Sequence, residues 1–467
     1  MYSILKIKNN SDDKIILPID QILTKSIKNI NNYDRNNYKI FFESIEKFIE
    51  DNHLIIGGAF ASMLLYNEVN ILNYTNMIIY EIYSEEPKED AIKLSNILYN
   101  IDSSGISRYT YVLSKIQNNL YHIFLNARLI CIFKKIPIYK GVNIEYLIVS
   151  QQIKSIYLAN NIICMGNYIQ LINLYADLNN PILIEDCQKK LLLEHNIRQK
   201  YIQNIHKNDI TFHKKLKLNQ VLEQKNNIDM SFIYTYINNS NKVIIGDVGL
   251  YLLKNHKKKI HYNDIKKFRL QVLTCNKLED DGKLLNIIGK KYNLDIQWSI
   301  SMPKYIDDFY LKRLTAYVMV NGHKRTILDM FNYGEYTIIG YNTAQNINGL
   351  KTISGKLLES NNIKYGSIFI LMRFRLIDEW IFNLLYELKS IDESTAKSMI
   401  TYSRNGFIVL SEYLDNISSN ILAYLNDLEY IGMAIDIGIE LKRKSVQSKY
   451  NVFSAYYPLN PNKYKLF

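Results

Sequence analysis

The chain has 467 residues, more than one hydrophobic core usually organises, so we expect two or three packed units. Its 57 lysines and arginines exceed the 45 acidic residues, and the formal net charge of +12 favours a polyanionic partner, nucleic acid first. The four cysteines are far apart and form no C-x-x-C pair, which argues against a zinc site or a disulfide framework. No apolar run approaches the ~20 residues of a membrane-spanning helix, and the N-terminus lacks the apolar core of a secretory signal. A globular protein of a reducing compartment, without membrane segments, is expected.

The first half of the chain predicts a mixed α/β unit. Residues 36–50 place Phe41, Ile45 and Phe48 at helical spacing, which predicts an amphipathic helix. Residues 53–66, HLIIGGAFASMLLY, then predict a short strand, a turn at Gly57 and Gly58, and a buried helix. Strands of one mixed sheet are expected from three apolar segments separated by a helix at 88–99, namely 77–83, 109–114 and 121–133.

The second half repeats part of this pattern. Residues 241–254, NKVIIGDVGLYLLK, again give an apolar run, a glycine turn and a helix, which indicates a weak internal repeat. The apolar segments 296–300, 314–320 and 325–330 are expected to complete a second sheet. The fold class expected is therefore α/β (α+β), with two related mixed-sheet units and a helical C-terminal region.

The expected domain organisation follows from these patterns. Residues 185–203 predict a long surface helix, and the polar stretch after it reads as a linker. The tail lacks periodicity and is expected to lie extended across another part of the protein. The expected segments are 1–35 (N-terminal), 36–203 (first unit), 204–228 (linker), 229–345 (second unit), 346–441 (helical region) and 442–467 (basic, tyrosine-rich tail).

A glycine turn that leads from a strand into a helix is one way to hold the phosphates of a nucleotide. Glycine lets the backbone approach the anion, and the unpaired N–H groups of the helix start face it. The same turn also occurs in many proteins for tight packing alone. Metal-dependent nucleotidyl transfer needs in addition two carboxylates one residue apart on the next strand and a third on a neighbouring strand, to hold two magnesium ions.

The order of these segments resembles a known family. GGAFASMLLY, then YEIYSEEPKEDAIKLSNIL, then YHIFLNARLICIFKKIPIYKG is similar to the poly(A) polymerase catalytic subunits of large cytoplasmic DNA viruses, over about residues 40–200. In that family the turn is followed by Asp-Phe-Asp, a hydrophobic residue, Tyr and Ser. The resemblance implies a nucleotidyltransferase fold, with Gly57, Gly58 and Ser62 at the nucleotide-binding turn and helix start and with Tyr83-Ser84 ending the strand. It extends more faintly to NKVIIGDVGLYLL and to residues 451–458.

The same resemblance implies that the metal-binding acids are largely missing. Ile79 falls where the first Asp belongs, Glu81 where the second does, and Arg128 near the third. A guanidinium within ~4 Å of a metal ion adds several kcal/mol of repulsion. Other acids, such as Glu85 and Asp90, lie in what should be loop and helix, without the alternate spacing that puts two side chains on one strand face. Glu81 also has a plain alternative as an exposed strand residue.

The second unit offers no replacement for these acids. Glu279, Asp280 and Asp281 precede a glycine, and this run reads more readily as a solvated turn than as a metal-binding strand. Asp295 lies within a strand-like segment and Asp329 near the end of another. The required pair of carboxylates is absent, so no metal site is expected here.

Basic clusters supply candidate contacts for RNA. Each alone is most often a solvated face, but clusters beside aromatic residues can combine phosphate contacts with base stacking. Further basic clusters are Lys134-Lys135, Lys266-Lys267 and Arg373 with Arg375. The RNA-binding candidates are Lys257, Lys258, Lys259, Arg313, Lys442, Arg443 and Lys444.

Three functional hypotheses follow. The first is a catalytically degenerate member of the viral poly(A) polymerase family that binds RNA or holds an active paralogue, or a second copy of itself, and that needs no cofactor. The second is an active ATP-dependent polynucleotide adenylyltransferase that uses Glu81 with Mg²⁺ or Mn²⁺. The third is a virion structural protein that associates with packaged nucleic acid. All three predict a viral protein of the host cytoplasm, at the viral factory, or of the virion.

Overall fold

A computed structural model gives the structure of the chain, and it describes most of the two predicted units. The described residues are 36–58, 61, 79–101, 110–115, 120–125, 128–136, 138–139, 142–143, 149–153, 156–159, 195, 198–205, 230–238, 240, 242–256, 258–301, 312–320, 322–332, 339–352, 356–358, 360–417, 424, 427–431, 455–456 and 458. Within them, no helix is both long enough and apolar enough to cross a membrane.

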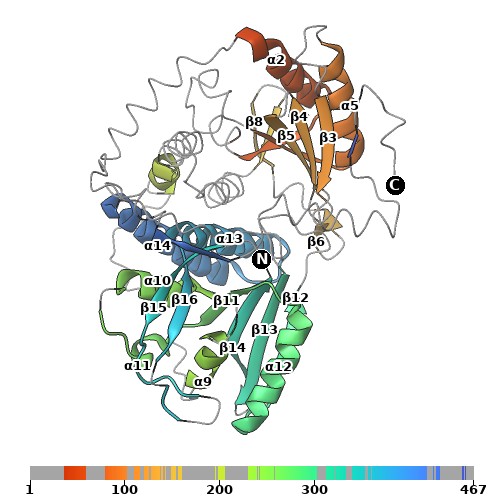
Figure 1. Ribbon diagram of the computed structural model, residues 1–467. Helices are drawn as coiled ribbons and strands as arrows, with labels where there is room; N and C mark the ends of the chain where they lie inside the picture. Colours follow the sequence, from red (N-terminus) through yellow and green to blue (C-terminus); the bar gives the residue numbers. More distant parts are fainter. Residues whose placement is uncertain are drawn as a thin grey trace, which may run out of the picture.

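The first unit is a mixed sheet covered by helices (Figure 1). Its strand order is β18-β3-β4-β5-β2-β1-β9-β8. A separate two-stranded sheet pairs β6 with β7. The helices are α2 (Asn36–Asp51) and α5 (Pro87–Asn100). The strands are β1 (Ile55–Gly57), β2 (Tyr80–Ser84), β3 (Thr110–Lys115), β4 (Leu120–Leu125), β5 (Arg128–Lys135), β6 (Ile138–Tyr139), β7 (Val142–Asn143), β8 (Val149–Ile153), β9 (Ile156–Ala159) and β18 (Ala455–Tyr456).

These elements form where the periodicity of the sequence predicts them. Helix α2 buries Phe41, Ile45 and Ile49 along one face. Helix α5 begins at Pro87, whose missing N–H costs nothing in a first turn, and it buries Leu94 and Leu98. The predicted helix at 36–50, the helix at 88–99 and the strands of one mixed sheet are confirmed, and the segment 121–133 is divided between β4 and β5.

The second unit is a mixed sheet in the order β12-β13-β14-β11-β10-β16-β15-β17. Its helices are α9 (Ser231–Asn238), α10 (Gly246–Lys254), α11 (Tyr262–Ile265) and α12 (Leu278–Lys291). Its strands are β10 (Val243–Ile245), β11 (Leu270–Thr274), β12 (Ile296–Ser301), β13 (Lys312–Val320), β14 (His323–Asn332), β15 (Ile339–Gln345), β16 (Asn362–Gly366) and β17 (Glu429–Ile431). The strands expected at 296–300, 314–320 and 325–330 are confirmed as β12, β13 and β14.

The two sheets are structural repeats, which confirms the internal repeat that the sequence indicated only weakly. Seven strands of each unit correspond in order, β3-β4-β5-β2-β1-β9-β8 with β12-β13-β14-β11-β10-β16-β15, and every corresponding pair has the same direction. A register shift interrupts β4–β5 after Ile123 and β13–β14 after Ala316, so even this irregularity is duplicated. Each unit adds an eighth strand at a different end, β18 beside β3 and β17 beside β15.

Two long helices complete the second unit, as the C-terminal periodicity predicts. They are α13 (Ile368–Glu387) and α14 (Glu393–Ile417), which pack together, and α13 also contacts α10, β10 and β16 (Figure 1). Ser367 caps the start of α13, because its side chain accepts a hydrogen bond from the Ile370 N–H. The region expected to be helical, 346–441, also contributes the strands β16 and β17. Along β16, the buried Ile363 and Tyr365 alternate with more exposed residues, as in a strand.

Two distant segments tie the chain together. In the stretch 185–203, expected as a surface helix, residues 198–205 are helical, but Arg198 and Tyr201 are buried. Arg198 forms an ion pair with Asp415 of α14, and the Tyr201 hydroxyl donates a hydrogen bond to Glu379 of α13. The tail was expected to lie extended, and within it β18 does add antiparallel to β3.

Candidate functional site

The Gly57-Gly58 turn ends β1 and faces the side chain of Glu81. Gly58 has a φ of +65°, a conformation that favours glycine, and Gly57 pairs with Glu81 across the β1–β2 ladder. A Cβ on Gly58 would lie 2.6 Å from Glu81 Oε1. The glycine therefore leaves room for a carboxylate of the protein itself. Ser62, predicted at the start of the following helix, lies outside the described residues.

Glu81 is buried and ion-paired with Lys134 on the neighbouring parallel strand. The Lys134 Nζ lies 2.9 Å from Glu81 Oε2, and the two side chains are only 4% and 3% exposed. Burying two charges is tolerable because each neutralises the other. Two expectations are corrected: Glu81 is not an exposed strand residue, and Lys134 is not part of a basic surface cluster.

The described side chains around Glu81 supply a single carboxylate. Ile79 immediately precedes β2, and the parallel register puts the buried Ile132 beside Glu81. Magnesium is held by oxygen ligands, whereas this group offers one carboxylate, two aliphatic side chains and an ammonium group. Among the described residues, no cluster of three or more His, Cys, Asp or Glu side chains is arranged to hold a metal ion. Arg128 begins β5, opposite Leu125 of β4, and its side chain is outside the described part.

The end of β2 is held by a hydroxyl–carboxylate contact that the second unit repeats. The Ser84 hydroxyl donates to Asp90 at 2.5 Å and accepts from the Glu86 N–H at 2.9 Å. In the second unit, the Thr274 hydroxyl donates to Asp281 at 2.8 Å and accepts from the Asn276 N–H at 3.2 Å. Ser84 thus joins the strand end to the following helix, a structural role that the Tyr-Ser ending of the motif did not reveal.

At the corresponding turn of the second unit, a side chain of the protein again occupies the space beside the glycine. Gly246 has the same φ of +65°, and a Cβ there would meet the side chain of Gln271, the residue that corresponds to Glu81. The next residue, Asp247, lies in the first turn of α10, where the helix dipole and free N–H groups favour an anion. Its carboxylate accepts hydrogen bonds from Arg375 and from the Tyr402 hydroxyl. A protein carboxylate therefore occupies the anion-favouring helix start.

A second ion pair of this unit joins Arg269 and Asp329. Arg269, two residues before Gln271, lies with its Nε 2.5 Å from the fully buried Asp329, which also accepts from the Thr315 hydroxyl at 2.8 Å. Burial raises the pKa of the nearby Asp378 to about 6, although Arg375, Arg269 and Arg313 lower it. Among the described acids of this region, Asp247 and Asp329 are each paired with an arginine.

The acidic run in α12 is another correction. Glu279, Asp280 and Asp281 form the first turn of a helix rather than a solvated turn, because acids there complement the helix dipole. Asp281 is 2% exposed and contacts Lys242 Nζ at 2.9 Å and the Tyr236 hydroxyl at 2.6 Å. Despite its burial, these contacts lower the pKa of Asp281.

The predicted basic contacts divide into exposed and buried residues. Lys258 and Lys259 are exposed, and Arg313 is half-buried. Arg373 and Arg375 are 2% and 3% exposed, so this pair is not a surface cluster. Lys257, Lys442, Arg443 and Lys444 lie outside the described residues.

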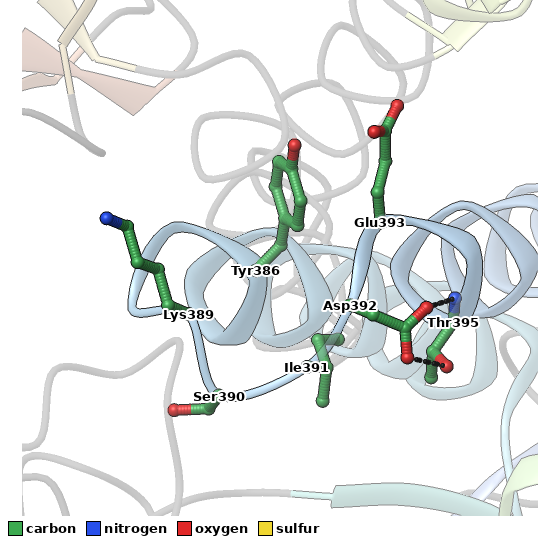
Figure 2. Close-up of a pocket in the computed structure, with 7 residues that line it drawn as sticks. All are labelled: Tyr386, Lys389, Ser390, Ile391, Asp392, Glu393 and Thr395. Carbon is green, nitrogen blue, oxygen red and sulfur yellow. Dashed lines mark hydrogen bonds between the residues drawn. The ribbon is translucent and has the colours of Figure 1, made fainter.

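A hollow lies where α13 turns into α14 (Figure 2). Asp392 there caps α14 by accepting hydrogen bonds from the backbone N–H and the hydroxyl of Thr395, at 2.9 and 2.8 Å. The hollow is open and shares no residue with either glycine turn, and we assign it no role. Its residues are Tyr386, Lys389, Ser390, Ile391, Asp392, Glu393 and Thr395.

Comparison with known proteins finds viral relatives. The chain is 26% identical over 356 residues to an uncharacterized protein of African swine fever virus, Malawi tick isolate, covering 75% of this chain and 77% of the relative. It is 25% identical over 383 residues to the same protein of the Pretoriuskop tick isolate, covering 81% and 82%. No protein-family model matches the chain.

A solved structure shares the fold. The crystal structure of the Megavirus polyadenylate synthase superposes with a TM-score of 0.53 and 16% sequence identity, covering 94% of this chain and 84% of that chain. The chain therefore has a poly(A) polymerase-like fold, as the resemblance of its sequence implied. At this identity the likeness establishes the fold and leaves activity to the residues of the site.

Proposed function

We propose that the protein is a catalytically degenerate, poly(A) polymerase-like viral subunit that binds RNA or holds an active polymerase during mRNA 3′ polyadenylation. One observation carries the proposal. Glu81, the only carboxylate at the positions that hold metal in the resembling family, is buried in an ion pair with Lys134.

The energetics of this pair oppose metal binding. A magnesium ion at Glu81 would have to displace the Lys134 ammonium or lie close to it. At ~4 Å and an effective dielectric near 20, a double and a single positive charge repel by about 8 kcal/mol. Ile79 and Ile132 supply no oxygen ligands to offset this cost. We therefore derive no nucleotidyl transfer step through this site.

What remains is a duplicated fold with a positive net charge. The formal charge of +12 favours association with a polyanion, and the exposed Lys258 and Lys259 are available to contact it. The fold it shares with a polyadenylate synthase makes RNA the polyanion that we propose. A non-catalytic subunit of this kind would lengthen the RNA track of a partner polymerase or stabilise it, within the viral factory or the virion.

Primer extension tests the proposal. Purified full-length protein is incubated with a short RNA primer, ATP and Mg²⁺ or Mn²⁺, and primer binding is measured in parallel. We expect RNA binding without extension. Extension that disappears in the Glu81→Ala variant would show an active site and refute the proposal.

A second arm tests the subunit role. An active polymerase from the same virus is added, and product length is compared with and without this protein. We expect longer products or tighter primer binding with it. Absence of any effect, together with copurification with capsid components, would favour a virion structural protein instead.

A further inference from the structure

Among the described residues, the internal repeat shows which sheet edge of the second unit lacks the strand that the first unit adds. In the first unit, β18 covers the edge strand β3, and the Tyr456 hydroxyl donates to Asn96 of α5 at 2.8 Å. The corresponding strand of the second unit is β12, which pairs with β13 alone among the described residues. Of the seven strands that the two units share, β8 is the other edge strand without an added neighbour among the described residues, and its side chains lie outside the described part.

The helix beside β12 differs from its counterpart at the position that faces the added strand. Helices α5 and α12 each have 14 residues, and Asp90 and Asp281 make corresponding contacts, so Asn96 corresponds to Ile287. Ile287 is 56% exposed and Leu284, one turn away, is 42% exposed. The second unit thus presents apolar side chains where the first presents a hydrogen-bonding amide, so the chain's own tyrosine strand is a poor match for this edge.

The edge strand itself lacks two of the usual protections against pairing. β12 reads Ile-Gln-Trp-Ser-Ile-Ser, without a charge or a proline. Its first five residues are symmetric in character about Trp298: Ile296 and Ile300 at the ends, the polar Gln297 and Ser299 between. In an antiparallel pair about a two-fold axis at Trp298, Ile296 would lie opposite Ile300 of a second copy and Gln297 opposite Ser299.

We propose that two copies of this chain associate through their β12 edges, joining the second sheets of the two molecules across a two-fold axis at Trp298. The register of the repeat supports this position. Val112 pairs with Ile123, and Trp298 pairs with Ala316; each partner is the residue at which the register shifts in its own unit. Val112 of the first unit therefore corresponds to Trp298 of the second. In the first unit, Tyr456 of the added strand lies opposite Val112. Trp298 of the second copy would therefore occupy the place of Tyr456, and Ile287 would contact it where Asn96 binds the tyrosine hydroxyl.

Oligomeric state and a designed charge pair test the proposal. Analytical ultracentrifugation of the full-length protein should show a concentration-dependent dimer. Gln297→Lys with Ser299→Lys in one chain places like charges opposite each other and should weaken dimerisation at least about tenfold. Gln297→Glu with Ser299→Lys places opposite charges across the same axis and should retain the dimer. Gln297 and Ser299 are both exposed, so thermal melting should confirm that each variant folds.

Ile287→Asp supplies an independent variant on α12, with Ile40→Asp, 52% exposed and on α2 of the first unit, as the matched control. We expect Ile287→Asp to weaken the dimer about tenfold or more and Ile40→Asp to leave it unchanged. A wild-type protein that stays monomeric at tens of micromolar would overturn the proposal. A dimer that is equally stable in both charge designs and in Ile287→Asp would also overturn it, because it would form through another surface.

Discussion

At the scale of single residues, the Glu81–Lys134 ion pair lies against the first glycine turn, where Glu81 packs on Gly58. Lys134→Met removes the ammonium 2.9 Å from a carboxylate that is buried with it. We expect a loss of about 3–5 kcal/mol in the free energy of unfolding, measured by urea denaturation. The double variant Glu81→Leu with Lys134→Met should recover most of this loss, because it buries no charge.

The control is Lys135→Met on the next residue, a half-buried lysine whose Nζ contacts the Glu85 carbonyl. We expect a loss below about 1 kcal/mol there. Strictly additive losses for Glu81→Leu and Lys134→Met would show that the two groups are not coupled and would remove the main support for the proposed function.

Asp378 predicts a pH dependence of stability. Its folded-state pKa of about 6 exceeds the ~3.9 of an unfolded aspartate, so the folded protein binds the extra proton between these values. Stability should therefore fall as pH rises from about 4 to 6 and change little from this group above that. Because the residue is half-buried, we expect a contribution of roughly 1–2 kcal/mol.

The comparison of wild type with Asp378→Asn isolates this contribution. In urea unfolding at several pH values between 4 and 8, the free energy of unfolding of the variant should rise relative to that of the wild type as pH rises. Asp295→Asn, an exposed carboxyl between α12 and β12, is the control, and its stability should change with pH as that of the wild type does. Identical pH profiles for Asp378→Asn and wild type would contradict the prediction.

At the scale of elements, the added strand β18 is anchored to the first unit by a side-chain hydrogen bond. The Tyr456 hydroxyl bonds Asn96 at 2.8 Å, and a hydrogen bond of this kind contributes about 1 kcal/mol. We expect Tyr456→Phe and Asn96→Ala each to lower the free energy of unfolding by about that amount and the double variant to lose no more than one of them. Hydrogen exchange at Thr110–Lys115 should quicken in all three, and unchanged exchange would mean that β18 does not protect this edge.

Most elements were predictable from the sequence, whereas the contacts at the turns were not. Helices α2 and α5 and strands β12 to β14 follow from local periodicity, which short stretches of sequence carry. The Glu81–Lys134 pair depends on the register between β2 and β5, and the Asp247–Arg375 pair joins residues 128 positions apart. Arg373 and Arg375 were misplaced because arginine is ordinarily exposed. Aligning the repeats at Gly58 and Gly246 would have pointed to Asp247 as the carboxylate at the helix start.

At the scale of the whole molecule, duplication gives two similar turns that are filled in different ways. At the first turn, Glu81 of the adjacent strand β2 pairs with Lys134 of β5. At the second turn, Asp247 of the helix α10 that follows the turn pairs with Arg375 of α13. The fold keeps the glycine conformation in both units, which suits its need for close packing against Glu81 and Gln271. Selection on such a molecule would act on its core and surfaces, and the surface charge is the property that an RNA-binding subunit would use.

Salt dependence tests that last step. The affinity for single-stranded RNA should fall steeply with ionic strength, because each neutralised phosphate releases a counterion. Replacing the exposed Lys258 and Lys259 by alanine should reduce the slope of log affinity against log salt by about 1.4, at ~0.7 per phosphate contact. Lys397→Ala, a lysine that is 75% exposed and paired with Glu393 on α14, is the control and should leave the slope unchanged. Equal effects per lysine at both places would show that the charge acts diffusely, and a flat salt dependence of the wild type would exclude phosphate contacts as the source of affinity.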